Sequence, residues 1–228
     1  MPDAPNLITT TRRPALSPIE RARTTTDEVE ERLILAIATG DKAFGDRITE
    51  AEIAAALKVS RVPAREAMKN LLLRGVLVEG EQRGLRVSDY SAARIAELFE
   101  LRLAIEKIIL EHAMRAGRDR EPMLRALEGI VDRMRSLSGS GDVVALSSVD
   151  LDFHRTVARY SGNELAAQIW EGLAQHLLIV FCRDWSNASD RTGEVRLHET
   201  LIDFIRNGSL ADLDAVLELH FSEPAQRS

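Results

Sequence analysis

Four residues in the second half of the chain have the types and the spacing to bind a metal ion. In the segment VDLDFHRTVARYSGN, Asp150 precedes His154 by four positions. On a helix of 3.6 residues per turn, the two side chains project from one face. That face also carries Leu151, Val157 and Ala158, which indicates that it turns towards a core. A carboxylate and an imidazole in a core need polar partners there.

The spacing of two later histidines supplies such partners. His198 and His220 lie on apolar faces of predicted helices, ten residues before and twelve residues after Gly208 in the turn between them. At about 1.5 Å of rise per residue, the two imidazoles lie at nearly the same height in a helical hairpin. Three imidazoles and a carboxylate suit Zn²⁺, Ni²⁺ or Mn²⁺. The sequence therefore predicts a divalent metal site, with zinc as the first choice. The predicted ligands are Asp150, His154, His198 and His220.

The alternative is that these histidines are hydrogen-bonded core residues, which is the usual role of a single histidine on an apolar face. Three histidines together with an aspartate favour metal binding instead. His112 and His176 are assigned to structural roles, because His176 lies about 9 Å from the level of His154 along the neighbouring helix.

Arg102 is another polar residue on an apolar stripe, together with Leu98, Ile105 and Ile109 at helical spacing. An unpaired buried charge is costly, so the guanidinium needs a partner. Glu106 could provide an i,i+4 ion pair within the helix. The functional interpretation is that Arg102 binds a carboxylate ligand beside the metal through two of its guanidinium nitrogens. The sequence favours neither one over the other.

These residues belong to a region, 91–228, in which every predicted element is a helix. The connections are short and rich in Gly, Ser, Asn, Asp and Pro. Six helices joined in this way favour an antiparallel bundle. The predicted helices cover about 91–116, 121–138, 142–160, 164–185, 190–206 and 209–222.

The first part of the chain has a different organisation. Residues 1–22 contain four of the seven prolines and are expected to form a mobile tail. Helices are predicted over 26–39, over 50–59 with Thr49 and Glu52 as a capping box, and from Ser60 to the stop at Gly75. The segment VLVEGEQRGLRVSDY then predicts a hairpin. This order is that of a winged helix-turn-helix domain, three helices and a β-hairpin, over 23–90.

The helix that starts near Ser60 offers a cationic stripe at i, i+4 and i+8, formed by Arg61, Arg65 and Lys69. Arginine can bind guanine O6 and N7 in the major groove, where the start of a recognition helix inserts. Without the surrounding motif, such a stripe is usually a solvated face. The motif instead predicts DNA contacts by Ser60, Arg61 and Arg65 and by Arg83 and Gly84 at the hairpin tip.

The composition limits the class of protein. The net charge is −6, with 14 basic and 14 acidic residues before position 91 and 16 basic and 22 acidic residues after it, so the excess acid lies in the helical region. Aromatic residues make up only 4% of the chain, which favours packed helices. No apolar run approaches the ~18 residues that a membrane span needs. With Cys182 as its one cysteine, the chain has no internal disulfide, and we expect a cytoplasmic protein.

The motifs also resemble a known family. The segment GDRITEAEIAAALKVSRVPAREAMKNLLLRGVLVEGEQRGLRV resembles the N-terminal domain of the GntR family of bacterial transcription regulators. The segments LFELRLAIEKIILEHA, DLDFHRTVARYSGN and LHETLIDFIRNGSLADLDAVLELH resemble the C-terminal effector-binding FCD domain of its FadR-like subfamily. The resemblance implies the DNA contacts and metal ligands named above and an Arg102 that faces the effector.

The expected function is that of a homodimeric regulator, and the resemblance favours a repressor. It would bind a palindromic DNA operator, and a small organic acid near the metal would change its affinity. The alternative is a metal-dependent hydrolase or lyase, in which the same site activates water. The sequence offers little support for an enzyme, because Asp152 points away from His154 and no other companion acid or base is evident. A purely structural metal is the third possibility.

Overall fold

The computed structural model describes residues 24–80, 84–115, 117, 119–186 and 191–225. The predicted tail, 1–22, lies outside these residues. The first part contains α1 (Thr25–Ala38), β1 (Arg47–Ile48), α2 (Glu50–Leu57), α3 (Arg61–Leu73), β2 (Leu77–Glu79) and β3 (Leu85–Val87). The second part contains α4 (Ala92–Ala113), α5 (Glu121–Leu137), α6 (Val143–Tyr160), α7 (Glu164–Ser186), α8 (Thr192–Asn207), a 3-10 turn η1 (Leu210–Asp212) and α9 (Leu213–Ala225).

The first part is a three-helix unit with a small antiparallel sheet, as the sequence predicted, but the sheet has one more strand than expected. Helix α3 packs against α1, α2 and the neighbouring strand β2. The strand order is β1-β3-β2, with Ile48 opposite Leu85 and Leu77 opposite Val87. Strand β1 has only two residues, too few to give an alternating pattern in the sequence.

Helix caps explain where the first two helices begin. Thr24 and Asp27 form a reciprocal capping box at the start of α1. At α2, the Thr49 hydroxyl accepts a hydrogen bond from the Glu52 backbone N–H at 3.3 Å. The other half of the predicted box is not formed, because the Glu52 carboxylate pairs with Lys42 instead. An ion pair with a nearby lysine has therefore replaced the second capping bond.

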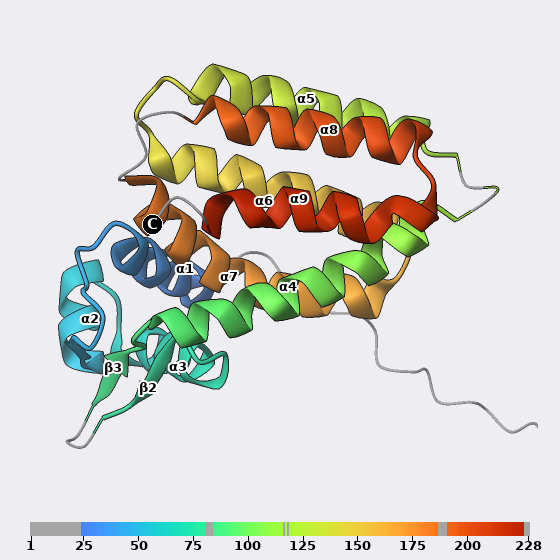
Figure 1. The fold of residues 1–228 in the computed structure, drawn as a ribbon. Coiled ribbons are helices and arrows are strands. Elements are labelled where there is room, and N and C mark those ends of the chain that lie inside the picture. The colour runs from blue at the N-terminus through green and yellow to red at the C-terminus, as the bar shows by residue number, and fades with distance from the viewer. Residues whose placement is uncertain (1–23, 81–83, 116, 118, 187–190, 226–228) are drawn as a thin grey trace, which may run out of the picture.

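The second part is the expected bundle of six helices (Figure 1). Helix α6 packs against α5 and α7, α4 packs against α6, α7 and α9, and α8 packs against α5 and α9. The inward faces of α4, α6, α8 and α9 therefore converge on one interior region. The predicted metal ligands and Arg102 all lie on these four helices.

The two parts contact each other along α7, which packs against α1. By length and composition alone, this helix could cross a membrane, whereas from the sequence we expected no segment that could do so. Its Trp170, Leu177, Ile179 and Val180 are fully buried against neighbouring helices. In this fold the buried side of α7 therefore packs against α4, α6 and α1, while Leu165 and Ile169 of the same helix are exposed.

Candidate functional site

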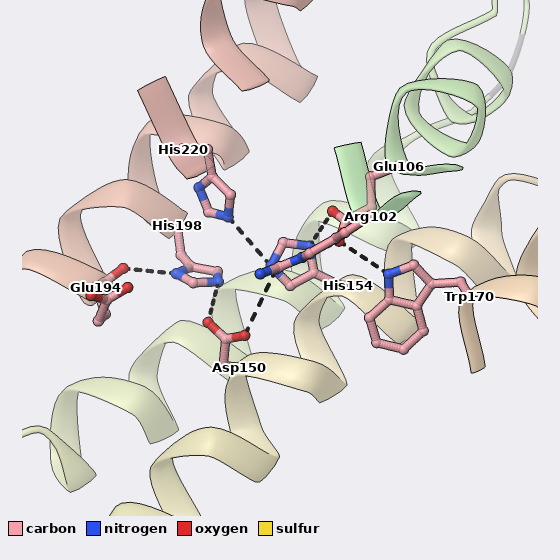
Figure 2. Close-up of polar contacts among 8 residues, drawn as sticks. All are labelled: Arg102, Glu106, Asp150, His154, Trp170, Glu194, His198 and His220. Carbon is pink, nitrogen blue, oxygen red and sulfur yellow. Dashed lines mark hydrogen bonds and ion pairs between the residues drawn. The ribbon is translucent and has the colours of Figure 1, made fainter. Parts of the chain in front are cut away.

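Three histidines meet in the interior of the bundle (Figure 2). The ring centroids of His198 and His220 are 4.8 Å apart, and those of His154 lie 5.3 and 5.2 Å from them. One nitrogen from each ring lies within 4.8 Å of the other two. All three side chains are buried. Helices α6, α8 and α9 thus bring together the three imidazoles that the sequence singled out.

Asp150 lies one helical turn before His154 and borders the same cluster. Its Oδ1 is 3.1 Å from the His198 Nε2. Its Oδ2 has no hydrogen-bond partner among the described residues, and lies 4.0 Å from the Arg102 guanidinium. Because the His198 Nδ1 bonds to the backbone carbonyl of Glu194 at 2.7 Å, it must donate there. The neutral His198 then directs the lone pair of Nε2 towards Asp150, an arrangement that a proton or a cation between them stabilises.

Arg102 forms the predicted pair with Glu106 and also contacts the histidine cluster. Its Nε donates to the Glu106 Oε1 at 2.8 Å, which is the predicted i,i+4 pair. A terminal nitrogen of the same guanidinium lies 2.9 Å from the His154 Nε2. The rings of Phe181 and Phe221 lie 5.1 and 4.4 Å from its central carbon. The guanidinium is therefore held among aromatic rings at the edge of the histidine cluster.

Glu106 connects the members of the site, although the sequence suggested it only as a partner for Arg102. Its Oε2 accepts a hydrogen bond from the His154 Nδ1 at 2.6 Å. Its Oε1 accepts from the Trp170 Nε1 at 3.0 Å as well as from Arg102. A carboxylate that binds Nδ1–H leaves the Nε2 lone pair of His154 directed at the cluster, which is the tautomer that a metal ligand needs.

The charges of the site follow from burial and from the neighbouring groups. Burial would raise the pKa of Asp150, but His198, His154 and Arg102 together hold this pKa at about 2. Burial would also raise the pKa of Glu106, but His154 and Arg102 keep it well below its usual range. Both carboxylates are therefore ionised near neutral pH.

Burial and neighbouring charges also set the pKa values of the three histidines, and they do so differently for each one. Burial lowers the pKa of His154 and, with the help of the other two histidines, lowers that of His220 far below its usual range. For His198, burial would lower the pKa, but the charge of Asp150 outweighs it and raises the pKa. With their lowered pKa values, His154 and His220 are neutral near pH 7, the state in which an imidazole binds a metal, whereas His198, whose raised pKa favours its proton, would release that proton on binding.

The residues present fit a divalent cation. Three imidazole nitrogens converge, the Asp150 Oδ2 has no hydrogen-bond partner in the described part of the chain, and the same is true of the His220 Nδ1. Hydrogen-bonding groups buried without partners are rare in folded proteins. An ion at the centre would compensate the Asp150 charge and the imidazole lone pairs together.

The predicted DNA-contacting residues lie at the exposed end of the first part. Ser60 is the N-cap residue of α3, but its side chain makes no capping hydrogen bond. Arg61 and Arg65 are exposed on the first two turns of α3. Arg65 makes two hydrogen bonds to the Glu50 carboxylate, at 2.9 and 3.0 Å, so it is oriented by a neighbouring helix.

Of the two predicted residues at the wing tip, Arg83 lies outside the described residues. Gly84 has a φ of +115°, and a Cβ there would lie 3.2 Å from the backbone oxygen of Ile48. This glycine is therefore required by the close approach of β1, a structural reason that the sequence did not reveal.

His176 and Tyr90 were not among the predicted site residues, yet both are buried at the contact between the two parts. The Tyr90 hydroxyl lies 2.7 Å from the His176 Nδ1. The His176 Nε2 lies 2.9 Å from the backbone oxygen of Arg74. An isolated histidine on an apolar helix could have signalled such a contact, but its partners come from parts of the chain 86 and 102 residues away.

Two family models match the chain. The model of bacterial regulatory proteins of the gntR family matches residues 25–87, and the FCD domain model matches residues 97–223, which is more than half of the chain. The first range contains α1 to β3, and the second contains the histidine cluster and Arg102.

Individual relatives agree with these matches. The gluconate operon transcriptional repressor of Bacillus subtilis (strain 168) is 30% identical over 145 residues, which cover 64% of this chain and 58% of that repressor. The probable D-xylose utilization operon transcriptional repressor of Paenarthrobacter nicotinovorans is 25% identical over 186 residues, covering 81% of this chain and 80% of that protein. The solved structure of E. coli McbR/YncC has a TM-score of 0.74 at 15% identity and covers 90% of this chain and 98% of that chain.

The structural likeness at this low identity supports the fold alone. The family models and the sequence relatives bear on the function. These relatives are named as regulators and not as enzymes, so the hydrolase or lyase alternative is not favoured. The chain belongs to the GntR family of bacterial DNA-binding regulatory proteins, and its helical bundle is an FCD domain.

Proposed function

We propose that the protein is a cytoplasmic homodimeric repressor whose affinity for a palindromic operator changes when a small carboxylate binds beside a divalent ion in the bundle. The observation that carries this proposal is the contact of the Arg102 guanidinium with the buried three-histidine cluster. A cation beside a metal site can attract one carboxylate twice, through a bidentate hydrogen bond and through an open coordination position. The site therefore suits a small organic anion.

Asp150, His154, His198 and His220 would hold the ion, with zinc as the first choice and nickel or manganese as alternatives. The bound ion would supply Lewis-acid attraction for a carboxylate oxygen. An ion that accepts five or six ligands keeps a position for this oxygen, whereas a four-coordinate ion bound by all four residues does not. The coordination number thus separates a sensory ion from a structural one.

On the DNA side, Ser60, Arg61 and Arg65 would approach the major groove with the start of α3, and the wing with Arg83 and Gly84 would approach the backbone. The uneven charge supports this orientation. All of the excess negative charge belongs to residues 91–228, so the DNA-binding part is electrically balanced, and three of its cations, Arg61, Arg65 and Lys69, lie on α3.

Two helices of the bundle support the dimer. Leu101 and Ile108 on α4 and Leu165 and Ile169 on α7 are exposed by 42 to 67% of their surface. Helices α4 and α7 pack against each other, and exposed large apolar side chains on neighbouring elements are typical of interfaces. A two-fold dimer would present two recognition helices to a palindrome. Sedimentation equilibrium of the wild type and Leu165→Glu measures this directly, and we expect the variant to be monomeric at concentrations where the wild type is dimeric.

The named relatives suggest the chemical class of the effector. They control operons for gluconate and, in one probable case, D-xylose. We therefore propose a sugar acid as the carboxylate, and D-gluconate as the first probe.

A thermal-shift experiment tests this site. The Zn²⁺-loaded wild type, Arg102→Ala, Arg102→Lys and the control Arg125→Ala are melted with and without D-gluconate and related sugar acids. Arg125 is a suitable control because it is exposed and pairs with Glu121 on its own helix. A ligand at 100 times its Kd stabilises the folded state by about 2.7 kcal/mol, and we expect a shift in wild type and Arg125→Ala that is lost in Arg102→Ala. Equal shifts in all proteins would contradict the role of Arg102.

The DNA-binding half is tested separately, by fluorescence anisotropy with a fragment of the region upstream of the gene and with a shuffled fragment of equal length. We expect specific binding that weakens when the active sugar acid is added. Equal binding to both fragments at moderate salt would contradict the operator proposal. Chelation that melts the bundle and leaves the sugar-acid shift intact would make the ion structural.

A further inference from the structure

The end of the recognition helix α3 is held by side chains of the bundle. The last carbonyls of a helix lack partners within the helix. At the end of α3, the backbone oxygen of Arg74 accepts a hydrogen bond from His176 at 2.9 Å, and that of Gly75 accepts one from Arg94 at 2.8 Å. His176 belongs to α7 and Arg94 to α4. Two consecutive carbonyls of the DNA-binding part are therefore bonded to two different helices of the effector domain.

The bonding of His176 is fixed at both nitrogens. A carbonyl can only accept, so Nε2 must carry the hydrogen that it donates to Arg74. Nδ1 then accepts from the Tyr90 hydroxyl at 2.7 Å. Tyr90 lies on the segment that connects β3 to α4, and its ring also lies 5.8 Å from the Arg94 guanidinium. The histidine is thus held between the recognition helix and the connection into the bundle.

Gly75 fits closely against the second donor. It has a φ of +77°, and a Cβ at this position would lie 3.1 Å from the Arg94 nitrogen that makes the hydrogen bond. Any other residue would be strained in this backbone conformation and would press on the guanidinium. The glycine at position 75 therefore lets Arg94 donate to the Gly75 carbonyl beside the Arg74 carbonyl that His176 binds.

The same two helices border the buried site, α4 through Arg102 and Glu106 and α7 through Trp170. Eight residues of α4 separate Arg94 from Arg102, and six residues of α7 separate Trp170 from His176, which correspond to about 12 and 9 Å along the two axes. At the site end, Glu106 of α4 accepts the hydrogen bond of Trp170 from α7. A shift of α4 relative to α7 at the site therefore reaches the two donors over a short length of rigid helix.

We propose that His176 and Arg94 are positioning residues of the recognition helix, which transmit the state of the histidine cluster to the end of α3 through the helices α7 and α4. The proposal rests on the proposed function in one respect, namely that an ion occupies the cluster. Hydrogen bonds weaken steeply when their geometry is distorted. When α4 and α7 move relative to each other, the two carbonyls must follow their donors or lose one bond, and the orientation of α3 changes. Two states with different contacts are what allosteric coupling requires.

Hydrogen exchange with Zn²⁺ as the only added ligand tests this coupling. Amide exchange is measured on peptides that cover residues 61–76, with Zn²⁺ and with a chelator, in the wild type, His176→Gln, His176→Leu and Arg94→Met. Gln can keep a donor near the position of the His176 Nε2, whereas Leu cannot. We expect Zn²⁺ to change the exchange of residues 70–76 in the wild type and in His176→Gln. In His176→Leu and Arg94→Met we expect this change to be lost, with basal exchange at the helix end about fivefold faster, as the loss of one hydrogen bond predicts.

Arg125→Met serves as the control, because it removes the same charge from the bundle at a position whose ion pair lies within α5. The Zn²⁺ affinity of each variant, measured by competition with a chelating dye, should equal that of the wild type, since neither His176 nor Arg94 contacts the cluster. An unchanged Zn²⁺ response of residues 70–76 in both His176→Leu and Arg94→Met would overturn the proposal. If Zn²⁺ binds to the wild type without changing this segment, the coupling is wrong and the ion site stands. If Zn²⁺ does not bind, the ion site and the coupling are both wrong.

Discussion

Two arginine–glutamate pairs in this protein have nearly the same N–O distance and opposite surroundings. Arg65 and Glu50 meet at 2.9 Å between α3 and α2, with 60 and 38% of their side chains exposed. Arg102 and Glu106 meet at 2.8 Å within α4, with 3 and 4% exposed. The first pair lies on the surface proposed to bind DNA, and the second lies in the site proposed to bind an ion and an acid.

The difference lies in what each pair costs to break. An exposed pair is worth about 0 to 1 kcal/mol, because water solvates both charges after separation. A buried pair that loses one partner leaves an uncompensated charge, at a cost of about 3 to 5 kcal/mol. The exposed pair can therefore orient Arg65 and still release it to DNA. The buried pair instead keeps the guanidinium fixed until a competing anion arrives.

The largest expected effect comes from breaking the buried pair. Glu106→Gln removes the charge that faces Arg102 and leaves one acceptor oxygen for Arg102, His154 and Trp170, which now share two, with little change in shape. We expect the free energy of unfolding to fall by about 3 to 5 kcal/mol. Urea denaturation at pH 7 without metal measures it.

Glu50→Gln is the matched control, because it makes the same chemical change in the exposed pair. Its free energy of unfolding should differ from that of the wild type by less than about 1 kcal/mol. Losses of equal size in the two variants would remove the distinction between the two regions.

The second prediction concerns the exposed arginine itself. Arg65→Ala should leave the free energy of unfolding within about 1 kcal/mol of the wild type. It should weaken operator binding by about 1 to 3 kcal/mol if Arg65 reaches a base edge, which corresponds to about 5- to 150-fold in Kd. Titration of operator DNA by fluorescence anisotropy, with Arg125→Ala as the control, measures this loss. A variant that binds as tightly as the wild type would restrict Arg65 to its pair with Glu50.

The sequence predicted most of the fold, since periodicity and turn residues define long helices well. Helices α4 to α8 begin and end within a few residues of the expected positions. The two-residue strand β1 and the half-formed cap at Thr49 were missed. Both depend on contacts that local patterns do not contain, namely the pairing of Ile48 with Leu85 and the competition of Lys42 for Glu52.

The candidate site, like the fold, could be predicted from the sequence only in part. The similar height of His198 and His220 along their two helices could be calculated from their distances in sequence to the turn between them, because the rise per residue of a helix is regular. The hydrogen bonds of Glu106 to Trp170 and to His154 join residues 64 and 48 positions apart, and no spacing rule connects them. The same holds for His176, whose partners lie in the other part of the molecule.

The third prediction changes the exposed pair from its acidic side. Glu50→Gln removes a negative charge beside the DNA surface and releases the two Arg65 hydrogen bonds. We expect operator affinity to rise by a few fold at low salt, since the electrostatic part of DNA binding is screened by salt. Anisotropy titrations between low and high salt measure it. A decrease in affinity would mean that the orientation of Arg65 by Glu50 matters more than the charge it neutralises.

The smallest effect is expected at His176, between the two regions. Burial and the Arg94 charge lower its pKa from the ordinary value of 6.5, and the hydrogen bond to the Arg74 carbonyl only partly opposes them. The Tyr90 hydroxyl on its other side is neutral, because burial raises the pKa of Tyr90. The unfolded chain therefore binds a proton below pH 6.5 that the folded chain does not, so the free energy of unfolding falls as the pH falls.

His176→Gln has no such proton to bind. Its free energy of unfolding should resemble that of the wild type near pH 8 and should fall less steeply as the pH drops below 6.5. Urea denaturation across this range, compared with His112→Gln as an exchange at a more exposed histidine, measures the difference. Because the buried cluster titrates in both proteins, it cancels in the comparison, and any remaining difference in slope belongs to His176. Parallel stability profiles for wild type and His176→Gln would mean that the contact between the two parts stays intact when His176 is charged. In that case, this contact would resemble the exposed Arg65 pair more than the buried Arg102 pair.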